Sequence, residues 1–220
     1  MSFLPPVIVD YFLSALTTLM VTVDPPGLAP IFLSLTLGMN SDERRKVAFR
    51  AVMIMTGVMV GFALLGQSLL EALGIGFPAF RIAGGLLLFW IAFEMIFELR
   101  TRRKSSVART AIDEDHIRNV AAFPLAIPLM AGPGTITATM LLAGNAGGNT
   151  LKLGALVAVI ALVAIACLAV FLVAERMAKL LGVTGNLVLT RLLGVILAAL
   201  AVQFVIDGIK AILAMPRPLP

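Results

Sequence analysis

The stretch VTVDPPGLAPIF, from Val21 to Phe32, carries an acid, two adjacent prolines and a glycine in the middle of a long apolar segment. Proline lacks a backbone donor and clashes with the preceding helical turn, and glycine leaves the backbone free to unwind. In a soluble protein such a stretch is typical of a surface turn. The surrounding sequence must decide whether it has that role here.

The overall composition is that of a membrane protein. Hydrophobic residues make up 60% of the 220-residue chain and charged residues 13%, with a mean hydropathy of +1.04. Ordinary globular domains are about half apolar and about a quarter charged. Apolar runs of about 20 residues, the length that crosses the hydrocarbon core of a bilayer, recur along the chain. The composition therefore predicts an all-α, polytopic integral membrane protein.

Six hydrophobic segments are candidates for membrane spans. They are Val7–Leu37, Val47–Leu70, Phe77–Leu99, Val120–Ala143, Leu151–Ala174 and Leu187–Leu213. The first segment is too long for one straight span of about 20 residues, and it contains the quoted stretch. The N-terminus has no basic leader before its apolar run, so we expect the first span to be retained rather than cleaved.

The basic residues are concentrated in the loops after spans one, three and five; these loops and the first residues of the spans that follow hold 13 of the 17 lysines and arginines. The positive-inside rule then places these loops in the cytoplasm and both termini outside it. The net charge of +5 is explained by membrane orientation, so we expect no nucleic-acid partner. Residues 101–119 are predicted to be a basic cytoplasmic loop that sets the topology, with anionic lipid binding as the alternative.

The two halves of the chain resemble each other. Arg81-Ile-Ala-Gly-Gly aligns with Arg191-Leu-Leu-Gly-Val at an offset of 110, and Pro26-Gly27 aligns with Pro133-Gly134 at an offset of 107. Three spans in each half force the second half to enter the membrane from the opposite side. We therefore predict two inverted repeats, residues 1–100 and 120–220, joined by the loop 101–119. This architecture is typical of secondary transporters.

The second copy of the opening stretch is IPLMAGPGTITATM, from Ile127 to Met140. Interrupted backbone at membrane depth must be buried in protein or line a wet cavity, so both copies should face the interior and break spans one and four. The N–H ends of the following half-helices attract a carboxylate, and the carbonyl ends of the preceding ones attract an amine or cation. The predicted substrate-binding residues are Asp24, Pro25, Pro26, Gly27, Gly132, Pro133, Gly134 and Thr135.

Asp24 is the most informative of these residues, because an ionisable side chain within a span is costly and indicates a function. Three roles are open: binding a substrate ammonium, carrying a coupling proton, or capping the half-helix that follows. The second copy has Ala131 in its place, which favours a single polarised site. Among the nearby threonines, Thr135 is the best candidate for a hydroxyl that lines the pocket. The glycines of GVMVG, Gly57–Gly61, have the spacing of a close helix contact.

An intramembrane enzyme is a poor alternative. His116 lies in the charged loop, and Cys167 has no neighbouring activator in the sequence. There is no metal-ligand spacing and no phosphate-binding glycine loop followed by lysine. We expect no catalytic residues, no metal site and no cofactor.

Both Pro/Gly segments carry a family resemblance. DPPGLAPIF together with PLAIPLMAGPGTITA resembles the signature segments of the MarC/SnatA family of bacterial and archaeal inner-membrane proteins. The resemblance covers essentially the whole chain. The family's motif residues fall on Asp24, Pro25, Gly27, Pro30, Pro128, Gly132, Pro133, Gly134 and Thr135. The resemblance implies a plasma-membrane protein and, as in some members, transport of small neutral amino acids such as glycine and alanine.

The expected function is a secondary transporter or exchanger of small neutral amino acids that works by alternating access, with proton coupling through Asp24 as a hypothesis. The expected partners are the amino acid substrate and the lipid bilayer. The substrate's identity, the direction of transport, the coupling ion and the oligomeric state remain open. A channel for small solutes and a non-transporting membrane scaffold are the alternatives.

Overall fold

The computed structural model describes residues 6–113 and 120–214, which contain helices and no strand. Five of the helices are long and apolar enough to cross a membrane, or six if the bent pair Ala121–Met130 and Pro133–Ala146 counts as one span. This confirms the prediction of an all-α membrane protein. The helices are α1 (Pro6–Val23), α2 (Pro25–Leu35), α3 (Ser41–Ala72), α4 (Phe77–Ile96), α5 (Leu99–Asp113), η2 (Ala121–Met130), α6 (Pro133–Ala146), α7 (Thr150–Leu172) and α8 (Ala174–Leu213).

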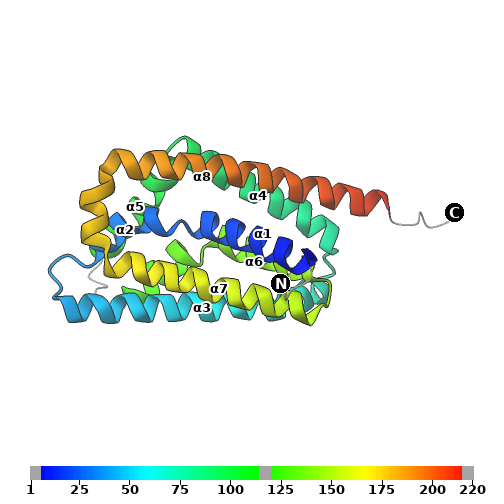
Figure 1. Ribbon diagram of the computed structural model, residues 1–220, viewed down its shortest axis with the longest axis horizontal. Coiled ribbons are helices and arrows are strands. Elements are labelled where there is room, and N and C mark those ends of the chain that lie inside the picture. The colour runs from blue at the N-terminus through cyan, green and yellow to red at the C-terminus, as the bar shows by residue number, and fades with distance from the viewer. Residues whose placement is uncertain (1–5, 114–119, 215–220) are drawn as a thin grey trace.

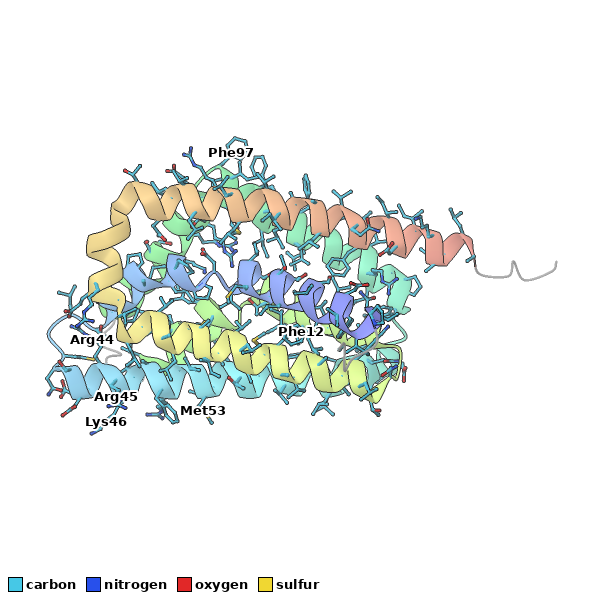
Figure 2. All side chains as sticks on the ribbon, viewed as in Figure 1. Phe12, Arg44, Arg45, Lys46, Met53 and Phe97 are labelled. Carbon is cyan, nitrogen blue, oxygen red and sulfur yellow. The ribbon has the colours of Figure 1, made fainter. Side chains whose placement is uncertain are left out.

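The long helices run roughly along one axis (Figure 1). The start of α1 and the end of α8 lie toward the same end of the bundle, whereas α2, α5 and the start of α8 lie at the other end. Arg44, Arg45 and Lys46, at the start of α3, are also at that second end (Figure 2). The basic segments after the first, third and fifth predicted spans therefore share one end of the bundle. Which side of the membrane that end faces remains a prediction.

Glycines allow α4 and α8 to pack closely along each other. A methyl group on Gly85 would lie 2.8 Å from the carbonyl oxygen of Ala201, and one on Gly194 would lie 3.1 Å from that of Ala92. Close backbone approach at small residues is how helices associate in lipid. The GVMVG glycines do not make such a contact, because a methyl group on Gly57 or Gly61 would have no neighbour within 4 Å.

The interior is filled by apolar side chains from several helices. The ring of Phe32 on α2 stacks on that of Phe171 on α7, with centroids 4.5 Å apart. Met55 and Met59 of α3 and Leu141 of α6 are fully buried. The outward surface is also apolar; its large exposed side chains include Leu65, Leu86, Trp90, Leu192 and Val195. An apolar surface of this extent suits contact with lipid.

Residues 99–113, most of which the sequence assigns to a loop, form helix α5. Its buried face carries Arg100 and Lys104 together with Ala108. These positions are four residues apart and therefore lie on one side of a helix. The backbone turns into α5 at Glu98, which has a positive φ of 63°. The remainder of the predicted loop, with His116, lies outside the described residues.

The α4–α8 contact gives a test of the packing. Gly85→Ala places a methyl group 2.7 Å from Cγ2 of Val205 and 2.8 Å from the Ala201 carbonyl oxygen, so the helices must move apart. We expect a loss of about 1–3 kcal/mol of stability, as for other overpacked sites. Thermal unfolding of the purified protein in detergent measures it. The control is Gly57→Ala, which meets open space and should be neutral or stabilising; equal Tm values for both variants would contradict this packing.

Candidate functional site

Asp24 separates α1 from α2. Its backbone is left-handed, with φ 58° and ψ 65°, and its side chain accepts a hydrogen bond of 3.1 Å from the backbone N–H of Gly27. The prolines Pro25 and Pro26 occupy the first helical turn, where no backbone donor is needed. The structure thus shows Asp24 in the capping role, and the other two roles, which capping does not exclude, remain predictions. Pro25 and Gly27 are buried and Pro26 is half-buried.

The carbonyl groups at the end of α1 are bonded by cations of the chain itself. Arg100 donates to the Thr22 carbonyl, and the Lys104 amine donates to the Val23 carbonyl at 3.3 Å. Both side chains come from α5 and are only 6% and 7% exposed. Cations at a helix C-terminus are stabilised by the helix dipole. The sequence suggested an amine or cation at these carbonyls, and here the cations come from α5.

Three buried charges meet at this point: Asp24, 3% exposed, and the two cations Arg100 and Lys104. The neighbouring Glu94 forms an ion pair of 3.0 Å with Arg103, whose positive charge it balances. When Lys104 is protonated, the three charges leave one positive charge uncompensated. A buried charge without a partner is costly, so the arrangement favours the arrival of an anion.

Lys104 holds its proton less firmly than an ordinary lysine. The pKa of Lys104 is lowered to about 7, mainly because burial disfavours the charged amine. The positive charge of Arg100 contributes to this lowering, and the negative charge of Asp24 opposes it. The positive charge of the cluster therefore changes near neutral pH.

The second Pro/Gly segment is bent more sharply than the first. η2 and α6 meet at an angle of 59°. Inside η2, Phe123 and Ile127 have extended backbone angles, as expected for residues that precede proline. Gly132 caps α6 without a side-chain hydrogen bond. The first backbone N–H groups of α6 therefore have no partner within the helix.

The two segments approach each other at Gly134. A methyl group there would lie 2.0 Å from Cδ1 of Ile91 and 3.8 Å from Cγ2 of Thr22. Only glycine fits such a contact without displacing a neighbour. The start of α6 therefore packs against α4 and against the end of α1.

A cavity of about 290 Å³ lies beside this junction. Its lining residues are Leu87, Trp90 and Ile91 of α4, Arg100, Arg103, Lys104 and Val107 of α5, and Pro128, Leu129, Gly132, Pro133, Gly134 and Thr135 of the second segment. The second half of the predicted site thus lines one cavity. Asp24, Pro25, Pro26 and Gly27 are not among its lining residues; they adjoin it through Arg100 and Lys104, which bond to the end of α1.

Two other threonines near the Pro/Gly segments bond back to their own helices. Thr22 donates to the Thr18 carbonyl at 2.6 Å, and Thr139 donates to the Thr135 carbonyl at 2.8 Å. This is the usual fate of threonine inside a helix. Thr135 is buried in the first turn of α6 and lines the cavity.

Sequence reasoning missed Arg100 and Lys104. Their signal is the spacing within LRTRRKSSVAR, where positions 100, 104, 107 and 108 follow one helix face. Arg103 is on the same short stretch and also lines the cavity, but its side chain is 54% exposed. Charge alone could not separate the two buried cations from their exposed neighbours.

Comparison with known proteins identifies the family. Residues 9–213 match the family described as MarC family integral membrane protein. The chain belongs to the MarC family. A UPF0056 membrane protein of Methanocaldococcus jannaschii is 36% identical over 207 residues, which cover 93% of this chain and 98% of the relative. The UPF0056 membrane protein YhcE of Escherichia coli is 35% identical over 193 residues, covering 86% and 87% of the two chains.

The relatives of this MarC protein come from both archaea and bacteria. A further UPF0056 membrane protein, from Archaeoglobus fulgidus, is 34% identical over 200 residues, covering 91% and 92% of the two chains. No solved structure matches the chain. The family confirms an integral membrane protein.

Asp24 gives a test of the buried charge cluster. Asp24→Asn keeps a cap acceptor and a residue that tolerates the left-handed conformation, but it leaves two buried cations without a carboxylate. We expect a loss of about 3–5 kcal/mol, as for other buried ion pairs that lose one partner. Thermal unfolding in detergent at pH 6, where Lys104 is charged, measures the loss.

The matched control for that test is the double variant Asp24→Asn/Lys104→Met, which removes one charge of each sign. It should recover part of the lost stability, because coupled charges show non-additive effects. If the loss of stability in the double variant equals the sum of the losses in Asp24→Asn and Lys104→Met, the two charges do not interact.

Proposed function

We propose that this MarC-family protein is a secondary transporter or exchanger of small neutral amino acids. The observation that carries the proposal is the cavity in which the uncapped start of α6 meets the buried Arg100 and Lys104. Free N–H groups at a helix N-terminus bind anions, and charge-assisted hydrogen bonds to carboxylates are strong. A volume of about 290 Å³ lies at the lower limit of small-molecule pockets and suits solutes the size of glycine or alanine.

The ammonium group of the substrate also needs partners. Pro128 and Leu129, at the carboxyl end of η2, line the cavity. The last carbonyl groups of a helix have no partners within it, so the end of η2 can accept hydrogen bonds from an ammonium. The substrate would lie with its carboxylate toward α5 and the start of α6 and its ammonium toward η2.

In our proposal, alternating access uses the two interrupted helix pairs. α1–α2 and η2–α6 are taken as equivalent parts of two inverted three-helix repeats, because each pair is interrupted at a Pro/Gly segment. The antiparallel packing of α4 along α8, which end the two proposed repeats, supports this arrangement (Figure 1). Rocking of one repeat against the other around a fixed site is the usual mechanism of such transporters.

We also propose a plasma-membrane location with both termini outside the cytoplasm, as the loop charges predict. The bacterial and archaeal relatives support the location. The proposed role is transport without catalysis, and the substrate is the only small-molecule partner in it.

A second candidate substrate class is supported by the charges of the cavity. Its lining includes Arg100, Arg103 and Lys104 and no acidic side chain. Small monocarboxylates such as propionate carry the group that these cations recognise and lack the ammonium. Competition between the two solute classes distinguishes an amino acid carrier from a general carrier of small carboxylates.

The test is uptake of labelled glycine and alanine into proteoliposomes that contain unlabelled amino acid. We expect saturable uptake that other small neutral amino acids compete with and that propionate inhibits only weakly. Gly134→Leu should reduce uptake at least tenfold, because any side chain there collides with Ile91. Gly57→Leu, which meets open space, is the matched control.

Three outcomes would contradict the amino acid carrier. Non-saturating flux would indicate a channel. Equal inhibition by propionate would favour the monocarboxylate carrier. No flux of either class through folded, inserted protein would indicate a scaffold.

A further inference from the structure

The two buried cations beside the cavity are chemically different. Arginine keeps its proton at any physiological pH, whereas a buried lysine can lose it. Arg100 and Asp24 carry opposite charges that interact. We take both charges as fixed, so that Lys104 is the variable charge of the cluster. The cluster changes between one positive charge and none according to the state of a single amine.

We propose that Lys104 is the site at which a co-transported proton binds, and that its protonated amine completes the carboxylate site of the cavity. The inference rests on the proposed transport function and identifies the group that links it to protons. It places the proton on α5 rather than on Asp24, which the structure uses as the cap of α2.

The position of Lys104 suits this role. Its amine donates to the Val23 carbonyl at 3.3 Å, and its side chain lines the cavity. A protonated amine has three donors, so two remain for a ligand. A neutral amine keeps a donor for Val23. Losing the proton therefore removes the charge without removing the bond to the end of α1.

Five other ionisable groups lie around Lys104 or are paired with its neighbours: Asp24, Glu94, Arg100, Arg103 and Cys167. Asp24 and Arg100 provide the fixed charges described above, and Arg103 is paired with Glu94 of α4. Cys167 of α7 is a buried thiol that also interacts electrostatically with Lys104. These neighbours, together with burial, account for the pKa of about 7 at Lys104.

The direction of the coupling follows from the charges. With an empty cavity, loss of the proton leaves the cluster neutral. With a carboxylate bound, gain of the proton leaves the carboxylate and the cluster together neutral. The ammonium of an amino acid lies apart from the cluster in this arrangement, where the carbonyl groups at the end of η2 offset its charge. The two other states, an empty cavity with Lys104 protonated and a bound carboxylate with Lys104 neutral, bury an unbalanced charge and are therefore disfavoured. A carrier that moves only in its balanced states transports one proton with each carboxylate.

Ligand binding must then raise the affinity of Lys104 for its proton. By the same linkage, protonation of Lys104 must raise the affinity of the cavity for the ligand. Well below pH 7 the amine is already protonated, so binding takes up no proton. Above pH 7 binding takes up as much as one proton, and the ligand affinity falls toward tenfold for each further pH unit.

Isothermal titration calorimetry of glycine and alanine binding tests this inference. Titrations of the purified full chain at pH 6 and pH 8, each in two buffers of different ionisation enthalpy, give the number of protons taken up. We expect close to zero protons at pH 6 and a substantial fraction of one proton at pH 8. Propionate is titrated in the same way, so that either substrate class reports on Lys104.

Two variants assign the proton to Lys104. Lys104→Arg fixes the charge, so binding at pH 8 should persist without proton uptake. Lys104→Met, a neutral replacement of similar length, should bind weakly at both pH values and take up no proton. The matched control is Lys46→Arg on α3, which lies outside the cavity lining and should behave as the wild type.

The possible failures are distinguishable. Binding without proton uptake in the wild type, or proton uptake that persists in Lys104→Arg or Lys104→Met, would overturn the inference and leave the proposed function standing. No binding of amino acids or propionate by folded protein would overturn the proposed function and this inference with it.

Discussion

The carbonyl groups that end α1 belong to the fully buried residues Thr22 and Val23 and therefore need hydrogen-bond partners within the protein. The break at Asp24 frees them, and Arg100 and Lys104 supply the partners. This requirement draws the first turns of α5, a strongly basic helix, into the bundle. The cavity, the surplus charge and the packing of α5 against its neighbours all follow from that one requirement.

The backbone groups at the helix ends have different partners in the two Pro/Gly segments. In the first, side chains of the protein satisfy both ends: Asp24 caps α2, and the α5 cations bond the end of α1. In the second, Gly132 provides no side-chain cap, and the start of α6 borders a cavity. The first segment is thus satisfied by side chains of the protein itself, whereas the second leaves N–H groups at the start of α6 beside the cavity. The proposed single polarised site depends on this difference.

The sequence predicted the features that depend on local backbone chemistry. Proline and glycine located the two places where one helix ends and the next begins, at Asp24 and before Pro133, and the apolar runs predicted the long apolar helices. The burial of Arg100 and Lys104 escaped prediction because it depends on contacts with the distant end of α1. The composition of α5 is that of a solvated loop, and only the spacing of its buried face suggests otherwise. The GVMVG motif failed in the opposite way. Its glycines have the spacing of a close helix contact, but a methyl group on Gly57 or Gly61 would have no neighbour within 4 Å.

The residue type at position 24 is now explicable from three simultaneous demands. The backbone is left-handed, which few residues other than glycine, asparagine and aspartate adopt readily. The N-terminus of α2 needs a side-chain acceptor, which glycine lacks. Two buried cations need a negative charge, which asparagine lacks. Aspartate meets all three demands, and Ala131, at the matching place in the second segment, meets none. The charge that distinguishes the two halves therefore depends on Asp24.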